Sequence, residues 1–434
     1  MIFSRINILF FLLFCNIFLG WAFQILTIVN IPINYIFLIL LLMLTINKKT
    51  INNLKTIKLY NILFFFIIFN LIKLFNDFFL YGLIAIRDAT FFIDHIYILI
   101  TLGIFVADED LIKLNNILKY FFYSVFIFIF CWIFKDFFIL LSPTVTSPTG
   151  MKANLLFNFS TLPFITTWFS FYLFVYPQVD KPIFKYLVLI FLLFFSLIVF
   201  QRRFLYLGLI ILFCISFIYQ RKIVYKISII FLVLFLILPL LSSLGITFSG
   251  KLGEVSNIAF FYNHLASSFS GYESQSDMFD ISQGTANQRI EWWSLVLNNQ
   301  FSDFKKLLFG SNFGVPLIDF VGYQYISIRE PHNSYITIFA RSGLVGFILY
   351  SILNIKLIII YINTLKHLNE HKFYFEKQIL IFLGIYIMFI YSMGLADSVI
   401  AYSFYSIPMN IFFGIVLFIH INLNKSINTD RINK

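Results

Sequence analysis

Charged residues are scarce in this chain, and their scarcity excludes an ordinary soluble domain. Only 12% of the 434 residues are charged and 60% are hydrophobic, whereas soluble domains carry about a quarter of their residues as charges. Cysteine is scarce as well. Cys15, Cys131 and Cys214 stand at unrelated spacings inside apolar runs, so the sequence indicates neither a disulfide framework nor a metal cluster. A polar cluster in such a chain is costly to keep near hydrocarbon and is therefore a candidate functional site.

Long apolar runs make up most of the sequence. A hydrocarbon core about 30 Å thick needs roughly 20 apolar residues to be crossed by a helix, and only helices or closed barrels satisfy their backbone there. The runs are continuous rather than alternating, which favours helices. We predict an all-α polytopic membrane protein with about twelve transmembrane helices, at 6–26, 31–46, 59–76, 90–107, 118–141, 155–176, 185–200, 204–219, 227–247, 333–362, 378–396 and 401–421.

The basic residues predict how these helices are oriented. They gather in the short loops after the second, sixth, eighth and tenth runs and near both termini. The positive-inside rule makes that face cytoplasmic, with both termini inside. The formal net charge of +11 is thereby explained without a nucleic-acid partner, which would need a soluble basic surface. The residues are Lys48, Lys49, Lys55, Lys58, Lys181, Lys185, Arg221, Lys222, Lys226, Lys366, Lys372 and Lys377, with Arg5, Lys425, Arg431 and Lys434 near the termini.

One connection is much longer than the others. It divides the chain into a bundle at 1–247, an external loop at 248–332, and a second group of spans with a short tail at 333–434. Most connections in compact proteins are only about 4–6 residues long. Within the loop, residues 266–287 are rich in polar and small residues and are predicted to be irregular.

A helix is predicted to follow that irregular stretch. Thr285 and Gln288 form a capping box at its start, and Gly310 stops it. Apolar residues between them recur at three- and four-residue steps, which predicts an amphipathic helix lying on the membrane surface or over the ends of the spans. These residues are Ile290, Trp293, Leu297, Phe301, Phe304 and Leu308.

Three arginines on the external side are candidate anion-binding residues. Arg289 falls in the first turn of the predicted helix, where a cation interacts unfavourably with the helix dipole. The position is explained if a phosphate binds there, because the arginine and the free backbone amides would both contact it. Alternatively, Arg289 pairs with a nearby acid or a lipid headgroup. Arg202 and Arg203 are adjacent in a short external turn. They either extend toward lipid phosphates or bind an anionic substrate, since the guanidinium fork suits a diphosphate.

The most informative motif is Glu330-Pro331-His332-Asn333-Ser334-Tyr335, which closes the long loop and opens the tenth run. It places an imidazole and hydrogen-bonding side chains where water meets lipid. Histidine titrates near neutral pH and can serve as a general base, so His332 is the candidate catalytic residue and Asn333 a candidate substrate contact. The alternative is an interfacial histidine that forms local hydrogen bonds only.

Arg341 lies nine residues further along the tenth run, roughly 13 Å deeper at helical rise. A cation at that depth must face a polar cavity or a partner, for which Asp77 and Asp397 are candidates. Substrate contact and a structural ion pair are both open. Gly343 and Gly346 would allow a neighbouring helix to approach closely. A further cluster either shares this cavity or forms a local network, and consists of Arg87, Asp88, Asp94 and His95.

Three stretches carry a resemblance to a known family. Pro331-His332-Asn333-Ser334 precedes a run with Gly343-Leu344-Val345-Gly346; Arg289-Ile290-Glu291-Trp292-Trp293 precedes a glycine-containing stretch at 308–314; and Arg203 precedes Gly208 at the start of a run. Together with the topology, this order resembles the O-antigen polymerase and O-antigen ligase superfamily of bacterial envelope glycosyltransferases. The chain departs from the ligase pattern at Arg341, where ligases tend to carry an acid, and this favours a polymerase.

The resemblance implies a glycosyltransferase of the bacterial inner membrane that needs no metal or other cofactor. Its donor and acceptor would be glycans on undecaprenyl diphosphate, bound from the surrounding membrane lipids on the periplasmic side. Arg203 and Arg289 would bind the diphosphate, with Arg202, Asn333 and Arg341 as further contacts, and His332 would act on the acceptor hydroxyl. Chain-length regulators and flippases are the protein partners implied. An O-antigen ligase acting on lipid A core is the first alternative, and a lipid-linked oligosaccharide transporter is the second.

Overall fold

A computed structural model describes the greater part of this chain. By contacts the chain divides into two units, Met1–Thr161 with Leu295–Lys434, and Leu162–Ser294. Each unit is described by itself. The described residues are 5–28, 31–45, 48–108, 111–146, 152–154, 161–175, 182–194, scattered positions within 225–243, 248–250, 253–255, 277–317, 330–371, 374–395 and 397–432.

Both units are built mainly from helices. The strands within the described ranges form three short antiparallel hairpins, in which β1 (Thr27–Ile28) pairs with β2 (Ile31–Pro32), β3 (Thr144–Thr146) with β4 (Lys152–Asn154), and β5 (Phe248–Gly250) with β6 (Gly253–Val255). The helices of the first unit are α1 (Arg5–Phe14), η1 (Cys15–Leu19), α2 (Trp21–Ile25), α3 (Ile33–Thr45), α4 (Lys48–Thr56), α5 (Tyr60–Tyr81), α6 (Leu83–Asp88), α7 (Thr90–Ile93), α8 (Ile96–Asp108), α9 (Leu111–Ile133), α10 (Lys135–Leu141), α17 (Phe304–Phe309), α18 (Ser334–His371), α19 (Tyr374–Met393), η4 (Val399–Ala401) and α20 (Ser403–Ile432). The second unit holds α11 (Leu162–Val175), α12 (Pro182–Phe194) and the larger part of α16 (Asp277–Phe301).

Five segments of the described chain are long and apolar enough to cross a membrane. They are Tyr60–Tyr81, Thr90–Ala107, Ser334–Asn369, Glu376–Met393 and Ser403–Asn424, and the bent pair α3–α4 would make a sixth. The described residues are mostly helical, and the apolar helices among them indicate a membrane protein, as the sequence predicts. The predicted run 204–219 and most of 227–247 lie outside the described residues, so the count of twelve stays a prediction.

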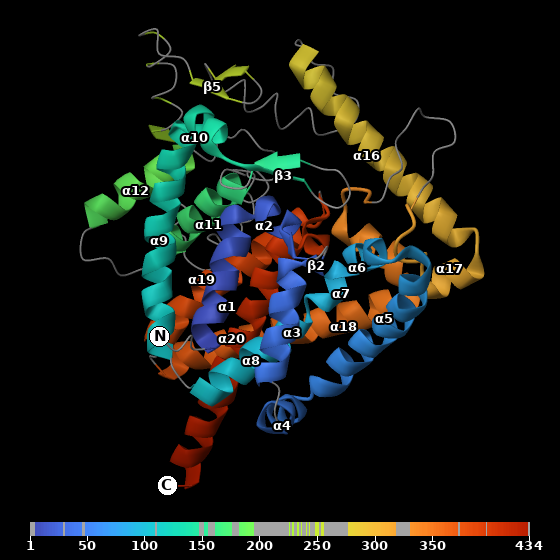
Figure 1. The fold of residues 1–434 in the computed structure, drawn as a ribbon. Helices are drawn as coiled ribbons and strands as arrows, with labels where there is room; N and C mark the ends of the chain where they lie inside the picture. The colour runs from blue at the N-terminus through green and yellow to red at the C-terminus, as the bar shows by residue number, and fades with distance from the viewer. Residues whose placement is uncertain are drawn as a thin grey trace. The chain divides into compact units, whose positions relative to one another are not determined.

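Helix α20 forms the centre of the first unit. It packs along α8 and also against α18 and α19 (Figure 1). Its side chains from Ser403 to Leu423 are buried at nearly every position, on all faces of the helix. A helix that is apolar all round belongs in the interior of a bundle. The Phe105 ring of α8 and the Phe418 ring of α20 lie 5.4 Å apart between centroids, which is within the range of favourable aromatic pairs.

Helix α16 differs from the prediction at both ends. It begins at Asp277 rather than after Thr285, so the predicted capping box lies inside the helix and residues 277–287 are not irregular. Two acids, Asp277 and Asp280, stand near its start, where carboxylates interact favourably with the helix dipole. The helix ends at Phe301, and Asp303 caps the separate helix α17 by accepting a hydrogen bond from the Lys305 backbone. The predicted stop at Gly310 is confirmed, because α17 ends at Phe309 with Gly310 in the left-handed region.

The division into two helices changes the predicted apolar face. Phe301 and Phe304 are 63% and 73% exposed, whereas Val296 and Gln300 are buried. The predicted stripe therefore does not form one continuous buried face. Large exposed aromatic side chains on a membrane protein are suited to contact with lipid.

Helix α18 starts at Ser334, as predicted, but its backbone is interrupted at Gly343, where φ is 64° and ψ is −173°. An interruption inside an apolar span is tolerated only where other groups satisfy the freed backbone. The first nine residues of α18 thus form a separate short helix between the predicted catalytic motif and the long span, and this arrangement positions the site.

Candidate functional site

Asn333 fixes the start of α18. Its Oδ1 accepts hydrogen bonds from the backbone N–H groups of Tyr335 and Ile336 at 3.0 and 3.1 Å, which is the arrangement of a helix N-cap. Its Nδ2 donates to the Leu395 carbonyl at 2.9 Å. The side chain is buried. The structure therefore gives Asn333 a capping role, and its predicted contact with substrate stays a prediction.

Ser334 ties this helix start to the loop that follows α19. Its backbone N–H donates to the Gly394 carbonyl at 2.8 Å, and its hydroxyl donates to the Asp397 carbonyl at 2.9 Å. The same hydroxyl accepts the Ile400 N–H at 3.0 Å. Three hydrogen bonds on one buried serine fix the position of Asp397 relative to the residue before Asn333.

That residue is His332, which lies in the left-handed region with φ of 51°. This conformation is uncommon for a residue with a side chain and persists only where surrounding contacts determine it. It turns the chain sharply into α18 and brings the imidazole to Asp397, with Nδ1 and Oδ1 3.0 Å apart. The His332 and Asp397 side chains are 36% and 43% exposed. The pair is thus held by the fold and accessible from outside it.

The Asp397 carboxylate determines what this imidazole can do. Oδ1 also accepts the Ser398 N–H at 2.8 Å, which orients the carboxylate. A carboxylate accepts hydrogen bonds, so His332 Nδ1 carries the proton and Nε2 is the proton-accepting nitrogen. A carboxylate behind a histidine fixes its tautomer and supports the imidazolium that forms when it takes up a proton. The arrangement is that of a general base with an orienting acid.

Glu330 lies two residues before His332 and is partly buried. The Tyr402 hydroxyl donates a hydrogen bond to its carboxylate, and Arg87 lies close enough to interact with it. Burial raises the pKa of Glu330 above its usual value, while Arg87 and the Tyr402 hydrogen bond oppose that shift. A second titratable carboxyl therefore stands in the same polar region as the His332–Asp397 pair.

Arg341 occupies a different and fully buried environment. Its guanidinium forms an ion pair with Asp88, with Nη2 and Oδ2 2.9 Å apart, and its side chain is 1% exposed. Nη1 donates to the carbonyls of Asn312 and Val315, each at 2.7 Å. The partner is thus Asp88 rather than the predicted Asp77 or Asp397. The described contacts are those of the structural ion pair that the sequence left open.

Lys73 and Asp77, one turn apart on α5, extend this network. Lys73 Nζ donates to the carbonyls of Phe309 and Ser311 at 2.7 Å and also to the Arg341 carbonyl. Asp77 accepts the Phe313 N–H at 2.7 Å, and Asp88 accepts the Gly314 N–H at 3.0 Å. Charged side chains from three helices therefore bind the backbone of the segment after α17.

Two glycines make this close approach possible. A Cβ atom added at Gly343 would lie 2.3 Å from the Leu308 carbonyl oxygen, and one added at Gly310 would lie 2.5 Å from the Arg341 carbonyl group. Both residues have positive φ, a conformation that glycine adopts without steric cost. The Ser311 N–H donates to the Ala340 carbonyl at 2.7 Å. The break in α18 is thus bridged by the end of α17, and the prediction of a close helix contact at Gly343 is confirmed.

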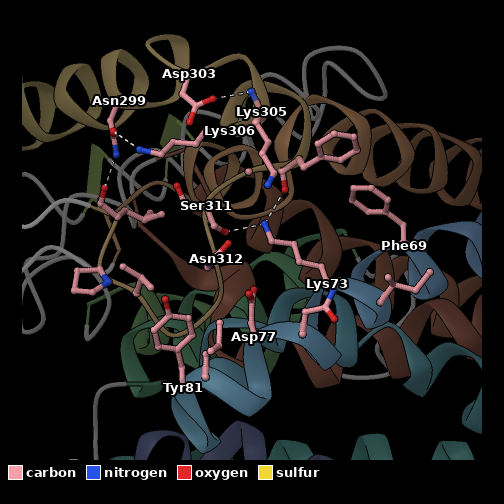
Figure 2. A pocket seen from close by; sticks show the side chains of 18 of the residues that line it. Phe69, Lys73, Asp77, Tyr81, Asn299, Asp303, Lys305, Lys306, Ser311 and Asn312 are labelled. Carbon is pink, nitrogen blue, oxygen red and sulfur yellow. Dashed lines mark hydrogen bonds between the residues drawn. The ribbon is translucent and has the colours of Figure 1, made fainter.

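A pocket of about 1090 Å³ adjoins this network. It lies between α5, the end of α16, α17 and the segment that follows α17. Figure 2 shows Lys73 and Asp77 on its α5 side, with Asn299, Asp303, Lys305 and Lys306 across from them. Asn76, Tyr81 and the segment Gly310-Ser311-Asn312 also line it. The apolar residues of the lining are Phe69, Ile72, Leu80, Leu295, Phe309, Val315, Pro316 and Leu317.

The remaining predicted residues divide into several groups. Arg289 lies on the part of α16 that belongs to the second unit, twelve residues after the start of that helix, so N-terminal amides do not accompany it. Arg202 and Arg203 lie outside the described residues, as does Cys214; Cys15 and Cys131 are free.

The cluster at the fourth run also divides. Asp88 joins the Arg341 network and pairs with Arg87 at 3.3 Å. Asp94 instead accepts hydrogen bonds from the hydroxyls of Ser403 and Ser406, and His95 Nδ1 lies 2.7 Å from the Phe91 carbonyl. The cluster therefore forms separate local networks rather than one cavity.

Two features of this region were not predicted. Lys73 carries much of the network, and its position four residues before Asp77 inside an apolar run was a signal available in the sequence. The pairing of His332 with Asp397 spans 65 residues and has no local signal. No group of three or more His, Cys, Asp or Glu side chains within the described ranges is arranged to hold a metal ion.

No protein-family model and no curated protein matches this chain.

Proposed function

We propose that this chain is a membrane glycosyltransferase that polymerises oligosaccharide repeat units linked to undecaprenyl diphosphate at the outer face of the bacterial inner membrane. The observation that supports this proposal best is the accessible His332–Asp397 pair at the start of an apolar span. An imidazole oriented by a carboxylate is suited to remove a proton from a sugar hydroxyl. Its place at the end of a span is where the head of a membrane-anchored glycan would meet it.

The chemistry follows from these groups. His332 Nε2 accepts the proton of the acceptor hydroxyl as that oxygen attacks the anomeric carbon of the donor. The bond from the anomeric carbon to the diphosphate breaks, and the diphosphate leaves with the bonding electrons. Arg203 and Arg289 are the proposed partners of that leaving group, because fixed guanidinium groups stabilise developing negative charge strongly where water is excluded. Arg202 is a further candidate contact.

The proposal assigns Arg341 to the framework rather than to the substrate, because its donors are directed at Asp88 and at two backbone carbonyls. Polymerase and ligase share the same donor chemistry and differ in the acceptor. The preference for a polymerase therefore rests on the sequence, in which an arginine stands where ligases tend to carry an acid. The transporter alternative predicts broken spans in corresponding halves of the chain. Helix α18 is broken at Gly343, but the sequence shows no convincing internal repeat that would relate this span to one in the other half.

The glycan profile of a strain that lacks this protein would separate the two enzymes. Loss of a polymerase leaves a single repeat unit attached to the lipid A core, whereas loss of a ligase leaves a bare core and lets lipid-linked polymer accumulate. A strain with an unchanged envelope glycan would contradict both. Chain-length regulators and flippases are the partners that this assignment implies.

The proposed mechanism also requires a topology of about twelve spans with residues 248–332 outside and both termini inside. The positive-inside distribution of lysine and arginine motivates it. The cysteine of Ser270→Cys should react with an impermeant maleimide added to intact cells. The cysteine of Lys222→Cys should react only after the membrane is permeabilised. The reverse pattern would place the His332–Asp397 pair on the wrong face for lipid-linked polymer growth.

A further inference from the structure

The pocket beside α17 has a construction that the proposed reaction does not use. Its volume of about 1090 Å³ is at the upper end of ligand pockets, which typically measure about 300–1000 Å³. It is lined by none of the residues assigned to the acceptor or to the diphosphate. The lining combines apolar side chains with lysines and amides (Figure 2), so it suits a ligand that is itself part apolar and part polar.

The apolar part of the lining continues onto surfaces that would face lipid. Ile72 and Leu80 line the pocket and are 62% and 70% exposed on α5, a helix long and apolar enough to cross a membrane. Phe304 and Phe309 of α17 are also exposed. The pocket is therefore bordered by hydrocarbon-compatible side chains on two elements, which is expected for a site reached sideways from the bilayer.

The polar part of the lining lies by the C-terminal end of α5. Asn76 and Tyr81 belong to the last turns of α5, and the end of a span coincides with the boundary between hydrocarbon and headgroups. Tyrosine is enriched at that boundary. Lys305 and Lys306 of α17 line the same pocket. A ligand with its chain against Ile72 and Leu80 would thus bring its headgroup to two lysines.

The charges of this lining favour an anionic headgroup. The Asp303 carboxylate accepts the Lys305 backbone N–H, and the Asp77 carboxylate accepts the Phe313 N–H and interacts with Lys73. The two acids orient toward the protein backbone, and the three lysines of the lining, Lys73, Lys305 and Lys306, outnumber them. Lys306 Nζ contacts Asn299 Oδ1 at 3.1 Å, which holds the ammonium group at the pocket, and Lys305 is exposed.

We propose that this pocket binds an anionic membrane phospholipid, with its phosphate at Lys305 and Lys306 and its acyl chain along the exposed face of α5. The site is independent of the proposed catalytic residues. Because α17 also closes the break in α18 through Gly310 and Gly343, a lipid bound here would stabilise the same segment that the buried charges hold.

The test uses the purified full-length protein in nanodiscs of phosphatidylcholine doped with phosphatidylglycerol. Phosphatidylglycerol retained per protein is measured by mass spectrometry after exchange into pure phosphatidylcholine. Loss of each lysine should weaken retention about fivefold, the effect expected for one lysine near an anionic surface. The Lys305→Gln/Lys306→Gln variant should therefore retain far less than the wild type, and Lys48→Gln/Lys366→Gln, which removes two exposed lysines elsewhere, should retain as much. Equal losses in both variants would overturn the proposal.

A second pair of variants tests the pocket by its volume instead of its charge. Asn76→Trp should fill the space next to α5 and reduce retention, because Asn76 is exposed and lines the pocket. Ile68→Trp adds the same bulk two turns earlier, at an exposed position outside the lining, and should not. Retention unchanged by Asn76→Trp would contradict the proposal. So would displacement of phosphatidylglycerol by an equimolar polyprenyl phosphate, which would assign the pocket to the lipid-linked substrate.

Discussion

Two polar regions of the first unit use charged side chains in opposite ways. In the buried network, Arg341 and Asp88 are 1% and 2% exposed at the side chain and direct their hydrogen bonds into the protein. At the start of α18, His332 and Asp397 are 36% and 43% exposed. Both regions act on the same helix, one at its break and one at its start. The difference suggests that the first maintains the fold and the second is available for chemistry.

The physical basis of this difference is solvation. An ion buried in a membrane protein loses its hydration, and ion pairs and hydrogen bonds within the protein must offset that lost free energy. The Asp88 carboxylate and the carbonyls of Asn312 and Val315 solvate Arg341 within the protein. Removing either member of the Arg341–Asp88 pair therefore leaves the other buried with fewer partners. The His332 and Asp397 side chains are both accessible from outside, so removal of His332 leaves no buried ion behind.

The largest effect on stability is expected at the buried ion pair. Arg341→Ala should lower the free energy of unfolding by about 3–5 kcal/mol, because the buried Asp88 carboxylate would lose its buried 2.9 Å partner and keep only the partly exposed Arg87 as a counter-charge. Arg341→Met/Asp88→Leu should recover part of this loss, since the carboxylate is gone while the Asn312 and Val315 carbonyls still lack their donor. Denaturation of the purified protein in detergent measures both.

Arg87→Ala is the matched control for this prediction. Arg87 contacts the same carboxylate at 3.3 Å but is 33% exposed, so its loss should cost no more than about 1 kcal/mol. If Arg87→Ala and Arg341→Ala were equally destabilising, burial would not be what distinguishes the two arginines.

The next largest effect is expected at the break in α18. Gly343→Ala should cost about 1–3 kcal/mol from the left-handed backbone alone, and more because its Cβ would lie 2.3 Å from the Leu308 carbonyl oxygen. Gly82→Ala provides the comparison, since Gly82 has a similar φ of 60° and nothing within 4 Å of its Cβ position. The difference in unfolding midpoint between the two variants measures the contact itself, and equal midpoints would show that α17 does not press on the break.

A smaller effect, of the opposite sign, is expected at His332. Both His332→Gly and His332→Ala lose the exposed Asp397 contact, which is worth at most about 1 kcal/mol. His332→Gly should still be as stable as the wild type or more stable by up to about 1 kcal/mol, because glycine adopts positive φ without strain. His332→Ala keeps that strain, so it should be slightly destabilised. A His332→Gly protein that unfolds as readily as Arg341→Ala would place the imidazole in the framework.

The smallest effect is expected at Glu330 and depends on pH. Its pKa is raised in the folded protein, so folding favours the protonated carboxyl; the resulting stabilisation is present at low pH and is lost as pH rises through the raised pKa. Wild-type protein should therefore gain stability relative to Glu330→Gln as pH is lowered from about 8 toward 5. Parallel unfolding midpoints of the two proteins across that range would mean that Glu330 titrates as an ordinary glutamate.

The sequence predicted the helices better than the contacts between them. Apolar runs of membrane-spanning length place the spans Tyr60–Tyr81, Glu376–Met393 and Ser403–Asn424 to within about five residues at each end, because the requirement for hydrocarbon thickness is local. Helix α20 continues beyond its predicted end, to Ile432. The partners of Arg341 and His332 could not be predicted, because Asp88 and Asp397 are distant in sequence and many acids were equally eligible. The start of α16 was missed because Ser, Gln and Gly suggested a loop, while the acids at 277 and 280 favour a helix start.

Part of the candidate site was also predictable from a local signal in the sequence. The motif around His332 stands out because polar side chains are rare in this chain, and it does open a helix. The positive φ of His332 and the interruption at Gly343 depend on contacts with α17 and with the loop after α19, so no local pattern announces them. The role of Lys73 could have been predicted, because a lysine four residues before Asp77 in an apolar run is a local signal.

The central claim is that His332 removes the acceptor proton in a transfer between lipid-linked glycans. The most direct measurement supplies purified wild-type, His332→Ala and His332→Gly proteins with a glycan on undecaprenyl diphosphate, without added metal, and follows chain growth. We expect the wild type to extend chains even with a chelator present, and both variants to bind the donor but extend it at least about 100-fold more slowly, the usual contribution of a general base. Chain growth by His332→Ala at the wild-type rate, or loss of wild-type activity with chelator, would contradict the claim.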